Sequence, residues 1–289
     1  MSWKNASVSM TRQNDVHGLV RPWERGRSFH LERITPSPEL DDTIERHWIV
    51  RWDLRGRRPL RQEILPHPSV NLVIEPDGAW LWGVPTERGT RTLRGRGWAV
   101  GTKFRPGAFT ALTGVEASTI TDGRMSLATA LGPGARALEP TTSAGPDVGA
   151  IVASVEELLA PLVPGENPSV ELIAEVIESM RTLPPDVRVK ELASLHYLAP
   201  RTLQRLFRRY VGVSPKWVLK RLRVHLAVEQ LSAARPPSWT ELALELGYYD
   251  HAHFIRDFRR VVGRSPAEYA VEAAHGRERC SAKLASGGR

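Results

Sequence analysis

The sequence predicts a multidomain α+β protein, in which a small antiparallel β-barrel is followed by an all-α domain of two helix-turn-helix units joined by a long helix. Three observations lead to this fold class. Short apolar runs separated by glycine and proline fill residues 28–110, a spacing typical of small barrels and sandwiches. The last third of the chain repeats itself at an offset of 50–51 residues. It also carries the positive charge, because residues 181–272 have a net charge of +7 and residues 1–180 have −2.

Composition excludes several classes of protein. With 41% apolar and 25% charged residues among 289, the chain is globular and has the length of one large or two ordinary domains. The single cysteine, Cys280, rules out a disulfide framework and a cysteine-built metal cluster, and it suits a reducing cytoplasm, where we expect the protein. No segment reaches the ~18 uninterrupted apolar residues of a membrane helix. The polar N-terminus lacks the apolar stretch of a secretory signal, so we expect no membrane partner.

The first half divides into a loose segment at 1–27 and a β-rich domain at 28–125. Five runs in this domain predict strands: FHLERI, HWIVRWDL, VNLVIE, AWLWGV and WAVGTKF. One helical insert is predicted at SPELDDTIERHW, where Ser37 is a suitable cap and Leu40, Ile44 and Trp48 fall four residues apart.

Residues 126–167 predict a linker with an amphipathic helix. A stretch rich in glycine, proline, alanine and threonine precedes the apolar period of residues 150–162. That helix is a candidate for a homodimer interface or for relaying the state of a ligand site. At the other end of the chain, residues 273–289 have a net charge of +3 and no apolar period, so we expect a disordered basic tail.

The internal repeat defines residues 168–272 as a helical domain. Matching segments are Glu191-Leu192-Ala193 with Glu241-Leu242-Ala243, Phe207-Arg208-Arg209 with Phe258-Arg259-Arg260, Gly212 with Gly263, and Ser214-Pro215 with Ser265-Pro266. Each unit is predicted to form a helix, a short turn and a second helix. The segment between the units predicts one helix of about 20 residues, or ~30 Å. Successive major grooves on one face of DNA lie ~34 Å apart, so such a connector could place one helix of each unit in double-stranded DNA.

The second helix of each unit carries the residue types that read DNA. Long polar side chains near the helix start are candidates for base contacts: Arg201, Thr202, Gln204, Arg205, His251, Ala252, His253 and Arg256. Basic residues further along are candidates for phosphate contacts: Arg208, Arg209, Lys216, Lys220, Arg221, Arg259 and Arg260. A solvated basic surface without a DNA role is the alternative for both sets.

The segment ELGYYDHAHFIRDFRRVVGRSPAEYA resembles the signature of the AraC/XylS family of transcriptional regulators. The shared positions are Leu246, Gly247, Tyr248, Asp250, Phe254, Arg256, Phe258, Gly263, Pro266 and Tyr269. The first unit departs from the family at Tyr197, where glycine is usual, and at Ala199, where a capping serine is common. The resemblance implies a sequence-specific bacterial DNA-binding protein, with RNA polymerase as a partner if it activates transcription. Whether it activates or represses is open.

The N-terminal half is similar to the sensor domains that precede this module in some family members, which are small and cupin-like. Such a domain implies an unknown small-molecule effector. The candidates for binding it are Trp48, Trp52, His67, Trp82 and Arg105, although tryptophans on strands also pack in cores. The sequence predicts no metal or cofactor and no enzyme, because its His-x-His pair lies in the DNA module and no catalytic motif is present. The rival hypotheses are an enzyme tethered to DNA and a DNA-binding protein without an effector.

Overall fold

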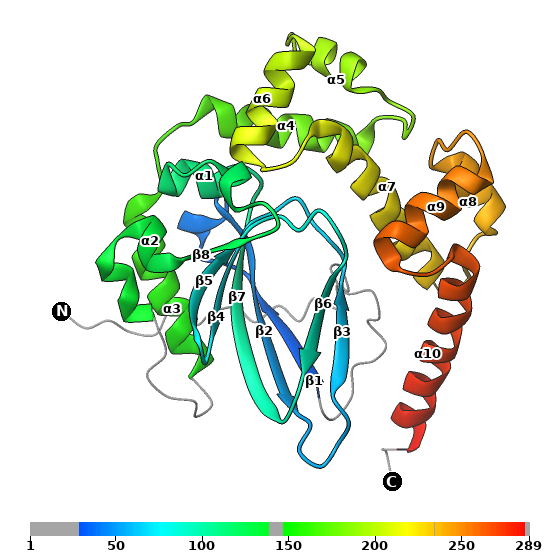
Figure 1. The fold of residues 1–289 in the computed structure, drawn as a ribbon, viewed down its shortest axis with the longest axis horizontal. Helices are drawn as coiled ribbons and strands as arrows, with labels where there is room; N and C mark the ends of the chain where they lie inside the picture. The colour runs from blue at the N-terminus through cyan, green and yellow to red at the C-terminus, as the bar shows by residue number, and fades with distance from the viewer. Residues whose placement is uncertain (1–28, 139–146, 234, 287–289) are drawn as a thin grey trace.

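The computed structural model describes residues 29–138, 147–233 and 235–286. The expected loose segment at 1–27 and residues 139–146 of the expected linker lie outside the described residues. Within them, an antiparallel β domain is followed by a helical domain that lies along one end and one side of it (Figure 1). The α+β fold class is therefore confirmed.

The β domain contains two antiparallel sheets. Six strands form the main sheet in the order β1 (Phe29–Ile34), β2 (Ile44–Asp53), β7 (Arg96–Phe104), β4 (Asn71–Glu75), β5 (Gly78–Trp82) and β8 (Arg124–Ser126). A second sheet pairs β3 (Leu60–Ile64) with β6 (Gly89–Leu93). Buried Phe29, Leu54 and Leu93 form a small core shared by strands of both sheets.

One face of the main sheet is covered by helices. The helical elements that follow β7 are α1 (Ala108–Thr113), η3 (Ala117–Ile120), α2 (Leu127–Leu131), η4 (Pro133–Leu138), α3 (Val148–Leu159) and η5 (Ala160–Leu162). α3 buries Val148, Val152, Val155 and Leu159 in the core of this domain. The amphipathic helix is thus confirmed, but its apolar face is already covered within the chain, which argues against it as a dimer interface.

A buried polar chain fixes α3 to the sheet. His47 of β2 is fully buried; its Nδ1 lies 2.8 Å from the Thr102 hydroxyl, and its Nε2 lies 3.1 Å from Glu156 of α3. The same carboxylate oxygen accepts the backbone N–H of Ser37 at 2.9 Å. The Thr102 hydroxyl, the His47 ring, the Glu156 carboxylate and the Ser37 backbone N–H thereby satisfy one another.

The helical insert predicted after Ser37 is wrong beyond its first turn. Residues Pro38–Leu40 form a 3-10 turn (η2), and the chain then enters β2. A four-residue spacing fits one face of a strand as well as one face of a helix, so the pattern was ambiguous. The β-branched residues Thr43, Ile44, Ile49 and Val50 favour the strand.

The helical domain contains seven helices among its described residues. They are α4 (Pro168–Thr182), α5 (Val189–Leu195), α6 (Pro200–Tyr210), α7 (Pro215–Ser232), α8 (Trp239–Glu245), α9 (His251–Val262) and α10 (Pro266–Ser286). α4, α5, α6 and the start of α7 share one core, and the rest of α7 shares another with α8, α9 and α10. The β domain adds one buried side chain to each: Val84 joins the first core and Leu65 the second.

The expectation of a disordered tail from residue 273 is wrong as far as Ser286, because α10 continues to that residue. Fully buried Tyr269 and Ala273 anchor the start of the helix. The residues that follow include three alanines, two arginines, one glutamate, one lysine and one leucine, which extend a helix easily once it has begun.

Candidate nucleic-acid interface

The two helix-turn-helix units are built alike, as the repeat predicts. Glu191 and Glu241, in the first turns of α5 and α8, accept the backbone N–H three residues before them, at 2.9 Å and 3.2 Å. Gly212 and Gly263 follow α6 and α9 with positive φ, as expected for helix-ending glycines. Ser214 caps α7 by accepting the backbone N–H of Trp217.

The two departures of the first unit have visible structural costs. Tyr197 lies in the left-handed region at φ +55°, where the second unit has Gly247 at φ +67°, and its side chain is 98% exposed. A residue with a Cβ in this region costs roughly 1–2 kcal/mol. Ala199 provides no side-chain cap for α6, whereas Asp250 caps α9 by accepting the His253 backbone N–H at 2.6 Å.

The base-contact candidates divide by exposure. Arg201, Gln204 and Arg205 of α6 are exposed, as are Ala252 and Arg256 of α9. The other three are half-buried. Thr202 faces partly inward, His251 packs edge-on against Trp239, and His253 does so against Tyr248 while its Nε2 lies 3.4 Å from Asp257. The exposed arginines and Gln204 therefore offer the donors that base edges require, whereas Ala252 offers only a methyl group. The two histidines also serve packing within their unit.

Six of the seven phosphate candidates lie at least partly open to solvent. Arg208, Arg209, Lys216, Arg259 and Arg260 are exposed, and Lys220 is half-buried beside Asp257. Arg221 differs, because it is buried with 6% exposure, lies over the Trp217 ring and donates to the backbone oxygen of Thr86 at 2.8 Å. In this arrangement Arg221 joins α7 to the β domain and does not face solvent, so its assignment to phosphate contact needs correction.

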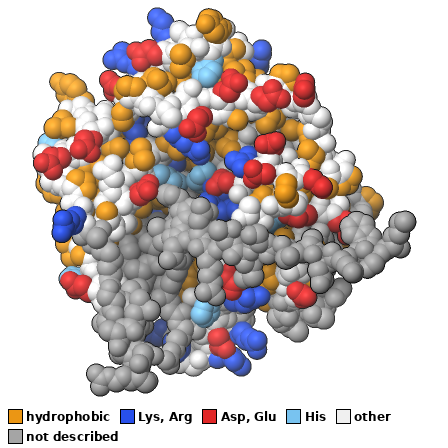
Figure 2. All heavy atoms as spheres, turned by 180° about the vertical axis from the view of Figure 1, so that it is seen from behind, with side chains coloured by type: hydrophobic (Ala, Val, Ile, Leu, Met, Phe, Trp, Pro, Cys, Tyr) orange, Lys and Arg blue, Asp and Glu red, His pale blue; other side chains and the backbone are white. Residues whose placement is uncertain are grey.

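Seen from behind, the molecule carries acidic and basic side chains intermixed (Figure 2). On the part of this face that the structure describes, blue and red side chains lie next to one another. The exposed arginines in the first halves of α6 and α9, such as Arg201 and Arg256, remain the most specific feature of the domain.

The β domain holds the first unit through residues that sequence reasoning missed. The Thr110 hydroxyl donates to the backbone oxygen of Arg209, at 3.1 Å, and the Thr121 hydroxyl donates to that of Gly212, at 2.8 Å. Both acceptors lie at the C-terminal end of α6, so its N-terminal half stays open. Threonines are common on any surface, and no local pattern marks these two.

A buried ion-pair group holds the second unit. Glu63 of β3 accepts from Arg88 at 2.9 Å and also contacts Arg264, which lies just before α10 and contacts Glu272 as well. Glu63 and Arg264 are each less than 10% exposed. They are separated by 201 positions along the chain. The hydrophobic periodicity of the sequence, which is a local signal, therefore could not predict that they contact each other.

The ligand candidates of the β domain do not form one site. Trp48 and Trp52 of β2 pack over Gly101 and Gly97 of β7, where an added Cβ would lie 2.0 and 2.2 Å from the indole atoms. Their indole nitrogens donate to the Asn71 side chain and to a backbone oxygen. These contacts show that both indole rings pack against neighbouring strands.

The other three candidates lie apart. Trp82 of β5 has Arg124 near its ring, at 5.1 Å, and Arg105 pairs with Asp41 at an exposed edge. His67 lies at the domain junction, with its ring 5.5 Å from that of His225 in α7. Effector binding by these five residues stays a prediction.

Burial shifts the pKa values of His67 and of Lys103. Desolvation lowers the pKa of His67 well below its ordinary value, and the charges of Lys103, His225 and Arg46 add to this. Lys103 is 6% exposed and pairs with Glu45 at 2.8 Å. Desolvation lowers the pKa of Lys103 to about 7, although Glu45 opposes the shift. In both cases burial disfavours the charged form of the side chain.

No group of three or more histidine, cysteine, aspartate or glutamate side chains within residues 29–138, 147–233 and 235–286 is arranged to hold a metal ion. In the same part of the chain, no helix has the length and apolar character needed to span a bilayer.

Two family descriptions match the chain. Residues 32–126 match a domain of unknown function (DUF6597), and residues 192–271 match a helix-turn-helix domain. The XylDLEGF operon transcriptional activator 1 of Pseudomonas putida is 30% identical over 104 residues, which cover 35% of this chain and 31% of that protein. The chain thus matches about a third of the length of the curated relatives.

Two solved structures are similar to part of the chain. A probable AraC family transcriptional regulator from Rhodopseudomonas palustris is 30% identical and covers 36% of this chain and 97% of that one, with a TM-score of 0.33. The DNA-binding domain of AdpA, solved in complex with a target DNA, is also 30% identical, over 37% of this chain and 92% of that one, with a TM-score of 0.31. The helix-turn-helix domain at residues 192–271 is therefore of the type found in AraC/XylS transcriptional regulators.

Proposed function

We propose that the protein is a sequence-specific DNA-binding transcription regulator whose two units read successive major grooves. The observation that carries this proposal is the pair of matched units, each with an exposed arginine in the first half of its second helix. The connecting helix α7 has 18 residues, or about 27 Å. That length is of the order of one turn of DNA, ~34 Å.

The relatives support this proposal. The AdpA domain was solved with a target DNA, and the Pseudomonas putida relative is named as an activator of an operon. Activation would make RNA polymerase a partner of this chain.

The β domain acts in this proposal as the sensor of a small-molecule effector. It contributes Val84 to the core of the first unit and Leu65 to that of the second. A change in the β domain would therefore reach both units through packed side chains. A ligand shifts such an equilibrium only by its differential affinity for the two arrangements.

Selection of genomic fragments with the purified full-length protein tests the proposal. Binding to the enriched fragment is then measured between about 50 and 200 mM salt. We expect one enriched sequence that still competes against random DNA at the higher salt. Binding that is weak, equal for all sequences and lost on adding salt would overturn the proposal, because it would reflect phosphate contacts alone.

A further inference from the structure

Two exposed tyrosines lie in the turns of the helix-turn-helix units. Among the phenylalanine, tyrosine and tryptophan side chains that the structure describes, only Tyr197 and Tyr249 are more than half exposed, at 98% and 95%. Tyr197 lies between α5 and α6, and Tyr249 lies between α8 and α9. Neither side chain has a hydrogen bond or a ring contact with another described residue. Each unit therefore presents one free aromatic ring, in the turn that precedes its second helix.

The backbone of Tyr197 is strained, and no contact within the described chain compensates for the strain. Its φ of +55° lies in the left-handed region, which disfavours every residue with a Cβ. The second unit has glycine, Gly247, at the equivalent position. Residues held in such sparsely populated conformations cluster at functional sites. Because the ring packs against no other part of the described chain, the partner that would explain this tyrosine lies outside it.

The second unit has its tyrosine two residues later, and the reason is steric. A Cβ at Gly247 would lie 2.8 Å from the backbone nitrogen of Asp186, in the loop before α5, so a side chain at this position would collide with that loop. Tyr249 instead stands immediately before Asp250, the cap of α9. Each unit thus holds its aromatic ring in the open part of its turn.

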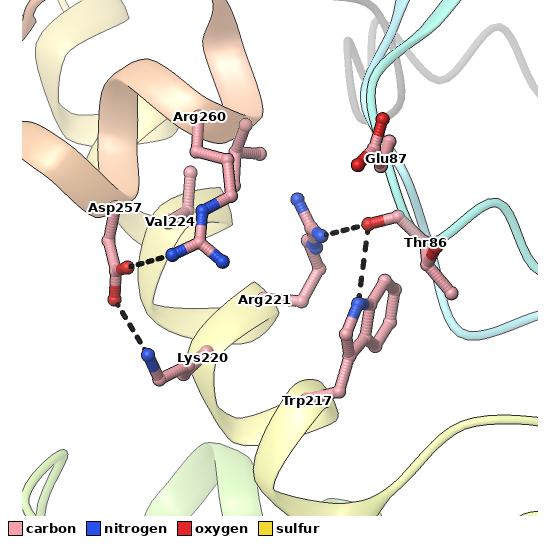
Figure 3. Close-up of a pocket in the computed structure, with 9 residues that line it drawn as sticks. Thr86, Glu87, Trp217, Lys220, Arg221, Val224, Asp257 and Arg260 are labelled. Atoms are coloured by element: carbon pink, nitrogen blue, oxygen red, sulfur yellow. Dashed lines mark hydrogen bonds and ion pairs between the residues drawn. The ribbon is translucent and has the colours of Figure 1, made fainter.

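Both turns precede the ends of the second helices that the β domain leaves open. In the first unit the β domain contacts the backbone oxygens of Arg209 and Gly212, at the C-terminal end of α6. In the second unit Arg221 of α7 donates to the backbone oxygen of Thr86, and Arg260, from the C-terminal half of α9, lines the same cavity (Figure 3). The N-terminal ends of α6 and α9 therefore remain accessible to a partner, together with the turns before them.

DNA is the partner that continues this surface. The exposed base-contact candidates begin directly after the turns, since Arg201 lies four residues after Tyr197 and Ala252 lies three residues after Tyr249. A segment that leads into the first turn of a recognition helix lies beside the groove. The base edges in the major groove present one apolar group, the C5-methyl of thymine, against which apolar side chains pack. An exposed aromatic ring at the start of such a helix suits that methyl group.

We propose that Tyr197 and Tyr249 determine sequence specificity, and that each packs its ring against a thymine methyl in the half-site read by its own unit. This proposal rests on the proposed function, because it needs both units on DNA. In the first unit the ring adds an apolar contact to the polar donors of Arg201 and Gln204. In the second unit it extends the apolar surface of Ala252.

Uracil substitution in the selected DNA site tests these contacts. Each thymine is replaced in turn by uracil, which lacks only the C5-methyl group, and binding of the full-length protein is measured by fluorescence anisotropy. One replacement in each half should weaken binding about fourfold, the worth of one buried carbon group. Tyr249→Ala should lose this sensitivity in its own half and keep it in the other. Tyr197→Ala should do the reverse, so that each variant is the matched control of the other.

Two further variants separate the ring from the hydroxyl group and from the fold. Tyr249→Phe should keep the sensitivity to uracil, because the ring remains. Tyr197→Gly should lose the sensitivity in the first half-site and at the same time raise the melting temperature by about 2–4 °C, since glycine relieves the left-handed backbone. A tyrosine with a purely structural role would not give a more stable protein that reads DNA less well.

Several results would overturn these contacts. One is that every thymine can be replaced by uracil without effect, and another is that the wild type and both alanine variants respond equally to uracil. If Tyr249→Phe loses as much affinity as Tyr249→Ala, the hydroxyl group and not the ring makes the contact. Unchanged DNA binding by both alanine variants would leave a protein as the partner of this surface. A chain that selects a bipartite site but ignores uracil refutes the tyrosine contacts alone, whereas a chain that selects no sequence refutes the proposed function.

Discussion

Replacing Glu63 by glutamine should destabilise the whole protein, because this side chain joins the two domains. Glu63 is 8% exposed and contacts Arg88 and Arg264, of which Arg264 is also 8% exposed. Removing one partner from a buried ion pair costs about 3–5 kcal/mol, since the other charge stays buried. The lower end applies here, about 3 kcal/mol, because Arg264 keeps its contact with Glu272.

The assay is thermal and urea unfolding followed by tryptophan fluorescence and by circular dichroism. A loss of about 3 kcal/mol lowers the melting temperature by roughly 6 °C or more in a chain of this size. Glu32→Gln is the control, because Glu32 pairs with Arg51 at 3.3 Å where both side chains are close to half exposed. Such a surface pair contributes about 0–1 kcal/mol. Equal effects of the two substitutions would refute the reasoning that the buried pair holds the domains together.

Three further predictions concern stability. Asp250→Ala removes the cap of α9 and should cost about 1 kcal/mol, measured by urea unfolding. Gly101→Ala places a Cβ 2.0 Å from the Trp48 ring and should cost about 1–3 kcal/mol by overpacking, whereas Gly165→Ala, in open space, should cost far less. The pKa of His67 is lowered in the folded protein. As the pH falls, His67 is therefore protonated in the unfolded chain before it is protonated in the folded chain, which favours unfolding. Stability should therefore be full above about pH 6.5 and fall below it, and His67→Gln should reduce this slope in melting curves.

The helical domain was largely predictable because its information is local. The repeated Ser-Pro, Gly and Phe-Arg-Arg positions fixed both units, and α7 was found to run from Pro215 to Ser232, close to the 20 residues expected. Each of those signals acts within a few residues of itself, as a cap, a stop or a buried face. Comparison with the family signature also identified Tyr197 at a position where glycine is usual. In the structure its backbone lies in the left-handed region.

The features that could not be predicted from the sequence depend on contacts between residues that lie far apart along the chain. Leu40, Ile44 and Trp48 fit two periods at once, and only the pairing of β2 with β1 and β7 decides between them. The burial of Arg221 follows from its contact with Thr86, 135 positions away. Basic residues on a DNA-binding helix look alike in sequence whether they face phosphates or a neighbouring domain.

The central claim is that both helix-turn-helix units recognise DNA bases. Its most direct test is the selection of DNA sites by the wild-type protein and by the Arg205→Ala and Arg256→Ala variants. Both arginines are exposed, one on each second helix, so neither substitution should disturb the fold. The wild type should select a bipartite site whose halves lie about one turn of DNA apart. Each variant should relax the sequence requirement in one half only, at a cost of about 1–3 kcal/mol. If both variants select the same site as the wild type, with a uniform loss of affinity, then these arginines contact phosphates and the account of base reading is contradicted.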